Sequence, residues 1–289
     1  MAIIWELDFY SRPLLDDNQK KVWEILLIQS PTNVTDDPAT LFKFSKFCSN
    51  QSVNSLWLGE AIHEACTLAS VRPQKIRFFR RAMRNMIAKA CSDQGIEPLP
   101  SRRTFALNNW LQEREDNFYP QQPGYTSPGP RTGVRYPETD PNLLPEAVRG
   151  DRGDKWLYAA LSAADLQEMP EWEIDFGEGF PVSLAALGED TPIPGLIYYS
   201  RRALPLAAWM SGLELCGLSL QLNVPPNLVL DTGIEERWVV ASLSSKDLVS
   251  ETKTFMSAIA KSKGLHFLAI QESPEDEKFA GFWLLRRES

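Results

Sequence analysis

The acidic residues Asp8, Glu60 and Glu64 are the side chains whose types and spacing could support hydrolysis in this chain of 289 residues. Two-metal nucleases gather carboxylates from separate elements around two divalent cations. Asp8 falls on a predicted strand, whereas both glutamates fall on a predicted helix. The strand that should supply a further acid, residues 75–80, carries lysine and arginine. Because cations there would repel Mg²⁺, we expect no catalytic residue and no enzyme, with a degenerate nuclease as an alternative.

The histidines and cysteines also lack the spacing of a metal site. Glu60-x-x-His63 has the spacing of half a di-iron motif, but the other histidine, His266, has Lys263 three residues before it. No CxxC pattern occurs among Cys48, Cys66, Cys91 and Cys216. The sequence has no glycine-rich phosphate-binding motif. We therefore predict no metal and no cofactor, and free thiols in a reducing compartment.

Basic and aromatic residues are interleaved in a segment that could hold a nucleic acid. The candidate contact residues are Lys75, Arg77, Phe79, Arg80, Arg81, Arg84, Arg102 and Arg103. Arginines pair with phosphates and aromatic faces stack on unpaired bases, which predicts binding of single-stranded RNA. The alternative is a solvated strand and helix start, whose arginines pair with Glu60, Glu97 or acidic residues of the second half.

The net charge of −8 is unevenly distributed, because the acidic excess lies in residues 121–289 while residues 1–120 are close to neutral. A nucleic acid is therefore expected on the first half or between the halves. The acidic second half supports a rival hypothesis, in which the protein is an interaction or assembly factor that docks a basic partner without touching RNA.

The hydrophobic patterns predict a mixed α/β protein of two domains. Proline and glycine are dense between residues 120 and 154, which predicts a linker between domains 1–119 and 155–289. The first domain is expected to contain strands 4–11, 21–29, 41–48, 75–80 and 102–111 and helices 53–70 and 82–94. This βββαβαβ order is that of the ribonuclease H-like fold. The second domain is expected to contain helices near 202–213 and 246–262 and strands near 155–162, 181–187, 195–200, 216–222, 227–231, 237–243, 265–271 and 279–286.

Two segments carry a resemblance to a known family. They are Trp5-Glu6-Leu7-Asp8-Phe9-Tyr10-Ser11-Arg12-Pro13 and Gly281-Phe282-Trp283-Leu284-Leu285. Both resemble the Tab/ATAB family, and the resemblance spans essentially the whole chain. It implies an RNA-binding factor, because algal and plant members act in the plastid stroma in translation of a photosystem I message, and cyanobacteria carry homologues.

The resemblance also implies an RNA-binding role for Trp283, Leu284 and Leu285. The pattern of this strand predicts instead that Trp283 and Leu285 face one side and Phe282 and Leu284 the other, mostly within a core. No apolar run approaches the roughly 18 residues of a membrane span, and residues 1–4 show no signal-peptide pattern. We expect a cytoplasmic cyanobacterial protein that binds an A/U-rich messenger leader and works with translation machinery or photosystem I assembly proteins. The sequence does not indicate an oligomeric state.

Overall fold

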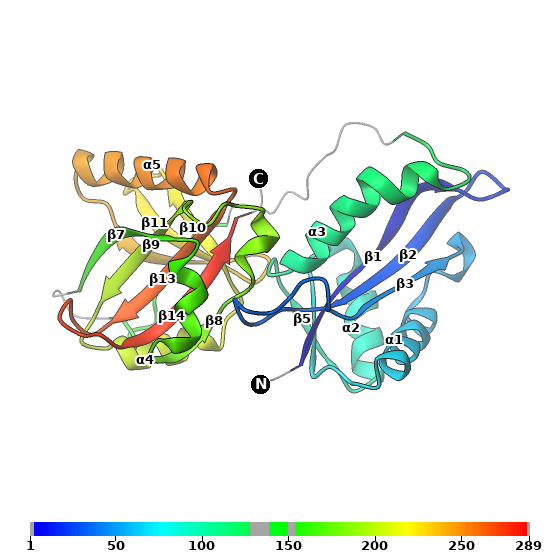
Figure 1. The fold of residues 1–289 in the computed structure, drawn as a ribbon, viewed down its shortest axis with the longest axis horizontal. Helices are drawn as coiled ribbons and strands as arrows, with labels where there is room; N and C mark the ends of the chain where they lie inside the picture. The colour runs from blue at the N-terminus through cyan, green and yellow to red at the C-terminus, as the bar shows by residue number, and fades with distance from the viewer. Residues whose placement is uncertain (1–2, 128–138, 150–153, 288–289) are drawn as a thin grey trace. The chain divides into compact units, whose positions relative to one another are not determined.

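The computed structural model describes residues 3–127, 139–149 and 154–287 and is a mixed α/β protein, as predicted (Figure 1). Its internal contacts group the chain into two units. The first unit contains residues 1–30 and 39–136, and the second contains residues 31–38 and 137–289. The sequence did not predict that residues 31–38 join the second unit. There the N–H of Gly179 donates to the Thr32 carbonyl at 3.2 Å, and Val34 is buried.

The first unit is built on a five-stranded sheet of order β3-β2-β1-β4-β5. Its strands are β1 (Ile4–Leu15), β2 (Lys21–Gln29), β3 (Lys43–Cys48), β4 (Lys75–Phe78) and β5 (Glu97–Pro100). The pairs β1–β2 and β2–β3 are antiparallel, whereas β1–β4 and β4–β5 are parallel. The elements follow one another as βββαβαβ up to β5, while membership of the ribonuclease H-like fold stays a prediction.

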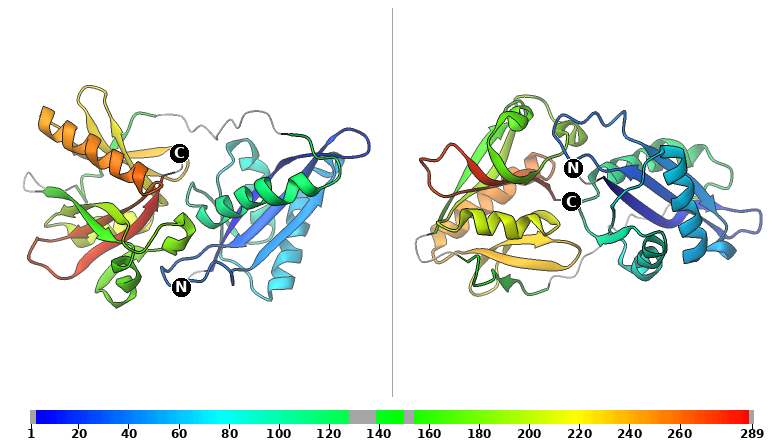
Figure 2. Two further views of the ribbon diagram at one scale, coloured as in Figure 1. Left: turned by 45° about the horizontal axis from the view of Figure 1, so that its top comes forward. Right: turned by 90° about the horizontal axis from the view of Figure 1, so that it is seen from below.

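The helices of this unit cover the two faces of the sheet differently (Figures 1 and 2). They are α1 (Ser55–Ala69), α2 (Arg84–Asp93) and α3 (Phe105–Glu113). Alternate residues of a strand point to opposite faces, so Leu7 and Phe9 share the core with α1 residues such as Ile62. The residues between them, Glu6 and Asp8, therefore point to the face that α3 covers.

Helix α3 replaces the strand predicted at 102–111, and the last strand of the sheet is β5 instead. A tertiary contact explains the error. The N–H of Leu107, in the first turn of α3, donates to the buried carboxylate Oε2 of Glu6 at 2.7 Å. A negative charge at a helix N-terminus satisfies a backbone donor that has no partner within the helix, and it also interacts favourably with the helix dipole.

The second unit contains two sheets, of orders β10-β11-β12-β6 and β7-β9-β13-β14-β8. The strands are β6 (Asn142–Leu143), β7 (Lys155–Ser162), β8 (Ile174–Glu178), β9 (Pro192–Tyr199), β10 (Leu215–Gln221), β11 (Asn227–Thr232), β12 (Glu236–Ser242), β13 (Leu265–Gln271) and β14 (Phe279–Arg286). Helices α4 (Ala203–Ser211) and α5 (Lys246–Lys261) share one hydrophobic core with both sheets.

Most predicted elements of this unit are present. Residues 181–187 were expected as a strand, but Val182–Ala185 form a 3-10 turn, and strands β6 and β8 were not predicted. β8 pairs with β14 in parallel, so its partner lies about a hundred residues away in the chain. The predicted linker 120–154 includes residues 128–138 and 150–153, which lie outside the described residues, so the predicted domain boundaries stay predictions.

Strand β14 contains the C-terminal segment Gly281–Leu285 that resembles the Tab/ATAB family, and this strand lies inside the core. Trp283 and Leu285 belong to the main core of the unit, while Phe282 stacks on Phe267 of β13, with ring centroids 5.2 Å apart. A Cβ at Gly281 would lie only 2.4 Å from the Trp283 ring. The glycine therefore allows the indole to lie flat against the strand. Burial of both faces of β14 confirms the predicted alternation.

Truncating this indole should destabilise the second unit. Trp283→Ala is expected to lower the free energy of unfolding by about 3–5 kcal/mol, because it leaves a cavity in the core. The exposed Leu204 of α4 provides the control, since Leu204→Ala should change stability by less than about 0.5 kcal/mol. Urea denaturation of the two variants measures the difference. Equal stability of both variants would contradict a core position for Trp283.

His266 of β13 is held neutral in the same core. Its Nε2 accepts the N–H of Leu218 at 2.9 Å, and its Nδ1 lies 2.8 Å from the Gly264 carbonyl oxygen. Because a carbonyl oxygen only accepts, Nδ1 carries the proton. Burial, with the charge of Arg287 as a smaller contribution, lowers the pKa of His266 from 6.5 to about 3.

This pKa predicts a loss of stability in mild acid. Unfolded His266 takes up a proton as the pH falls below 6.5, whereas the folded side chain stays neutral until about pH 3. Its contribution is therefore complete above pH 6.5 and declines below it, by about 2 kcal/mol at pH 5. His266→Gln should lose this part of the pH dependence when urea denaturation is compared at pH 7 and 5. Parallel behaviour of the variant and the unaltered protein would rule out this effect.

Candidate nucleic-acid interface

A buried network of charged side chains lies on the α3 face of the first sheet. Its members are Asp8 and Arg12 of β1, Glu24 of β2, Arg80 after β4, and Arg114 after α3. Arg12 joins the two carboxylates, since its Nη1 lies 2.9 Å from Asp8 Oδ2 and its Nε 3.1 Å from Glu24 Oε2. Three arginines and two acids leave the network with one positive charge.

Asp8 fixes the side chain of Arg80. Arg80 donates two hydrogen bonds to the Asp8 carboxylate, one from Nε and one from Nη2 at 3.1 Å. Asp8 is fully buried, and burial raises the pKa of a carboxyl group. The guanidiniums of Arg80 and Arg12 outweigh that effect and hold the pKa of Asp8 below its usual range. The carboxylate is therefore charged at neutral pH and fully engaged.

Glu24 anchors the segment that follows α3. It accepts hydrogen bonds from Arg12, from Arg114 of the π-helical turn η3 (Arg114–Phe118), and from the hydroxyl of Tyr119 in η4 (Tyr119–Gln121). Burial, together with the charge of Glu24, raises the pKa of Tyr119, so its hydroxyl stays protonated and donates. The network thus ties β1, β2, β4 and the end of α3 to one another.

The structure does not bring together the acids of the hypothetical nuclease site. Asp8 points to the α3 face, whereas Glu60 and Glu64 are exposed on α1, on the other side of the sheet. Glu64 pairs there with Lys46 at 2.6 Å. The guanidinium of Arg80 contacts the Asp8 oxygens that a metal would need. In the described part of the chain, no group of three His, Cys, Asp or Glu side chains could hold a metal ion.

Three of the RNA contacts predicted in residues 75–103 are buried, so the structure does not place them on the surface. Arg77 is only 2% exposed, and its Nη1 donates to the Ser30 hydroxyl at 3.3 Å. Arg103 is equally buried, with its guanidinium 5.5 Å from the ring centroid of Phe105. Phe79 is also buried. The sequence alternation could not reveal that α3 covers this face.

Other predicted contacts are accessible. Arg81 and Arg84 are exposed, on the short turn η2 (Arg81–Met83) and at the start of α2. Arg102 is half-buried. Lys75 is accessible as well, but it pairs at 3.5 Å with Glu97, an acid that the alternative interpretation assigned to the arginines.

Tyr10 adds an aromatic ring that sequence reasoning missed. It is 37% exposed, and the Arg80 guanidinium lies 4.0 Å from its ring centroid. The strong alternation of β1 could have pointed to it, because Tyr10 continues the polar series of Glu6 and Asp8. We call the group Tyr10, Arg80, Arg81 and Arg84 the basic corner. It offers cations for phosphates and one ring for a base.

The C-terminal residues Trp283, Leu284 and Leu285 do not belong to a surface. All three are buried, so they could touch RNA only if β14 left its sheet. Their burial favours a structural role, and the direct contact implied by the family resemblance stays a prediction.

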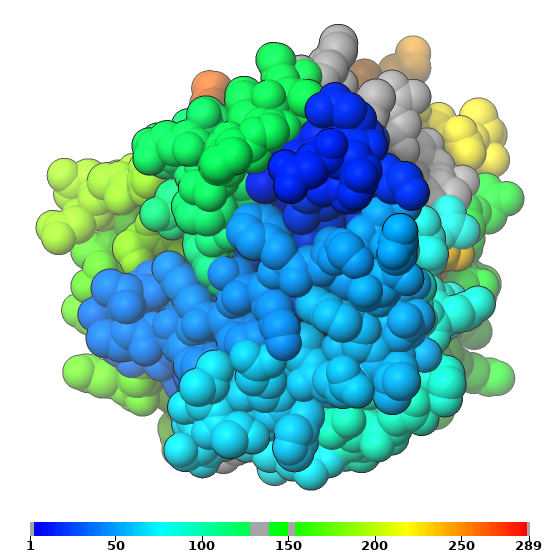
Figure 3. All heavy atoms as spheres, turned by 90° about the vertical axis from the view of Figure 1, so that its right-hand side faces the viewer, coloured from blue at the N-terminus to red at the C-terminus, as the bar shows by residue number. Residues whose placement is uncertain are grey.

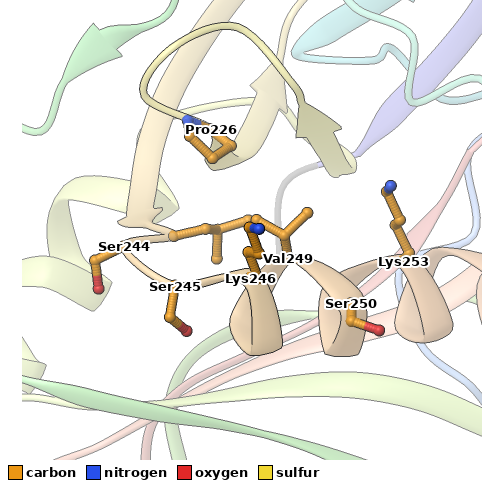
Figure 4. Close-up of a pocket in the computed structure, with 8 residues that line it drawn as sticks. Pro226, Ser244, Ser245, Lys246, Val249, Ser250 and Lys253 are labelled. Carbon is orange, nitrogen blue, oxygen red and sulfur yellow. The ribbon is translucent and has the colours of Figure 1, made fainter.

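The second unit has a surface pocket of about 440 Å³ beside the start of α5 (Figure 4). Lys246 and Lys253 of α5 line it together with serine hydroxyls, and Pro226 and Leu243 provide apolar walls. The Ser245 hydroxyl accepts the Leu248 N–H and so caps the helix. This mixed lining selects no single class of ligand.

Comparison with protein families accounts for nearly all of the chain. Residues 4–114 match the family described as RNA-binding protein Tab2/Atab2, N-terminal, and residues 131–286 match its C-terminal domain. The chain belongs to the Tab2/Atab2 family of RNA-binding proteins. This confirms the resemblance of its two ends to Tab/ATAB proteins. The basic corner lies within the N-terminal Tab2/Atab2 match, and the buried strand β14 lies in the C-terminal one.

Relatives in plants support the same assignment. The chain is 37% identical to the chloroplastic TAB2 homologue of Arabidopsis thaliana, across 97% of its own length and 74% of the relative. It is 35% identical to the chloroplastic TAB2 homologue of Zea mays, across 97% and 70%. None of the helices in the described ranges is long and apolar enough to cross a membrane.

Removing the carboxylate that orients Arg80 should destabilise the first unit. Asp8→Ala leaves Arg80 and Arg12 without their shared partner, and the loss of one member of a buried ion pair costs about 3–5 kcal/mol. The control is Asp17→Ala in the exposed β1–β2 turn, which should change stability by less than about 0.5 kcal/mol. Urea denaturation distinguishes them, and a loss below about 1 kcal/mol for Asp8→Ala would contradict the role of the network.

Proposed function

We propose that this Tab2/Atab2 protein binds A/U-rich single-stranded RNA through the basic corner, and so acts in translation or biogenesis of photosystem I subunits. Membership of an RNA-binding family supports the class of ligand. The chloroplastic relatives support a photosynthetic setting, which for this chain we propose to be a cyanobacterial cytoplasm. Its partners would be the messenger leader and the translation machinery or assembly factors of the photosystem.

The observation that carries the proposal is the orientation of Arg80 by Asp8. A charged side chain held in place loses less conformational freedom when it binds a ligand than a mobile one does. The side chain of Arg80 is 17% exposed, and its guanidinium lies 4.0 Å from the ring centroid of the accessible Tyr10. Arg81 and Arg84 follow on the next turns, where they can approach successive phosphates.

Single-stranded, A/U-rich sequence suits this corner for a physical reason. Proteins read single-stranded RNA where bases are unstacked and can lie against aromatic or guanidinium planes. Weakly paired A/U-rich leaders expose such bases. The single ring of Tyr10 and the three arginines would give modest sequence preference and strong dependence on charge.

We also propose that the protein performs no hydrolysis. The acids of the hypothetical nuclease lie on opposite faces of the sheet, and the guanidiniums of Arg12 and Arg80 bind the carboxylate oxygens of Asp8. In this proposal the protein acts on RNA by binding and positioning it, without cleaving it.

Charge reversal in the basic corner should weaken RNA binding. Arg81→Glu combined with Arg84→Glu is expected to lower affinity for a U-rich oligonucleotide at least tenfold. The slope of log affinity against log salt should become shallower by about 0.7 for each lost phosphate contact. Titration at several salt concentrations measures both effects. Arg80 is left unaltered, because its replacement would also disturb the buried network.

The matched control for this experiment reverses two exposed lysines of α5 in the second unit. Lys253→Glu combined with Lys261→Glu changes the net charge equally. This control should keep its affinity and its salt slope. Equal weakening by both double variants would mean that only net charge matters, and unchanged affinity of the corner variant would refute the proposed contact.

RNA incubated with the protein and Mg²⁺ or Mn²⁺ should remain intact. A metal ion cannot reach the Asp8 oxygens while two guanidiniums hold them. Gel analysis of a labelled oligonucleotide provides the test. Metal-dependent cleavage that disappears in Asp8→Asn would show that the nuclease alternative is correct.

A further inference from the structure

A second group of accessible rings lies between β3 and the end of α3. Its members are Lys43 and Phe47 of β3, Trp110 of α3 and Phe118 of η3, and we call them the aromatic strip. The Lys43 ammonium lies 5.8 Å from the Trp110 ring centroid. The rings of Phe47 and Phe118 are stacked, with centroids 6.5 Å apart and planes inclined by 17°.

The strip is open because β3 is the edge strand of its sheet. Lys43, Ser45 and Phe47 alternate along β3 and all three are exposed, Phe47 to 42%. Trp110 and Phe118 are half-buried, so each keeps part of its ring at the surface. Figure 3 shows this end of the first unit, where the dark blue β1–β2 hairpin lies against the green segment that follows α3.

The buried side chain of Arg114 contacts two rings of the aromatic strip. The guanidinium of Arg114 lies 3.9 Å from the centroid of Phe118 and 5.5 Å from that of Trp110. Arg114 is itself bound to Glu24 in the buried network. The ion network that orients Arg80 therefore also supports the strip.

We infer that the aromatic strip is a second RNA-contact surface, which stacks the bases of a single strand. This inference rests on the proposed RNA binding and adds a site to it. Accessible aromatic rings beside cations are the features with which proteins bind unpaired bases. The neighbouring acids Glu113 and Asp116 disfavour phosphates here. The strip should therefore contribute stacking and little counterion release.

If the two surfaces have these separate roles, their variants should differ in how the affinity for RNA depends on salt. Phe47→Ala combined with Phe118→Ala should lower affinity for a U-rich oligonucleotide about tenfold, while the salt slope stays unchanged. Phe47→Tyr keeps a ring and should keep the affinity. Leu56→Ala, on the exposed side of α1, serves as the control for loss of an apolar surface group. Thermal unfolding of each variant checks that the fold is intact.

A measurement that keeps an aromatic ring at every ring position of the strip covers the case in which the alanine variants unfold. RNA that stacks on Trp110 should quench its fluorescence, so Trp110→Phe should bind RNA but lose part of the quenching seen in the unaltered protein. Unchanged quenching, or full affinity of a folded Phe47→Ala, Phe118→Ala variant, would overturn the inference and leave the β3 edge for another occupant, such as an added peptide strand. Absence of RNA binding by the unaltered protein would overturn the proposed function as well.

Discussion

The ion pair between Asp8 and Arg80 is the interaction on which the rest of the first unit depends. A fully buried carboxylate is tolerable only when it is paired, and Asp8 is paired with two guanidiniums. Through Arg12 the pairing reaches Glu24, and through Glu24 it reaches Arg114 and Tyr119. One network thus orients a surface arginine and also fixes the segment after α3, so stability and proposed RNA contact share a cause.

The second unit shows why a sequence signature need not be a contact surface. The C-terminal residues Gly281, Trp283 and Leu285 fit together because the glycine makes room for the indole within a sheet buried on both faces. The burial of these residues predicts that a substitution here acts on RNA binding through the fold. The acidic excess of this unit is consistent with RNA contact elsewhere, on the nearly neutral first unit.

Sequence reasoning succeeded where periodicity and local caps decide the structure. Helix α5 was predicted at residues 246–262 and spans Lys246–Lys261 in the structure, where the Ser245 side chain caps its first turn. It failed at α3, whose first turn is satisfied by Glu6, roughly a hundred residues away. It also failed to separate buried from exposed arginines, because Arg77 and Arg81 look alike until the covering helix is known.

The most direct test of the account is to map where RNA touches the intact protein. Photochemical crosslinking of a 4-thiouridine-containing, U-rich strand, followed by mass spectrometry of the peptides, locates the contacts without altering the chain. The account predicts crosslinks on the peptides that contain Tyr10 and residues 80–84, and none on strand β14. Crosslinks concentrated on Trp283 and its neighbours, with residues 80–84 unmodified, would contradict it.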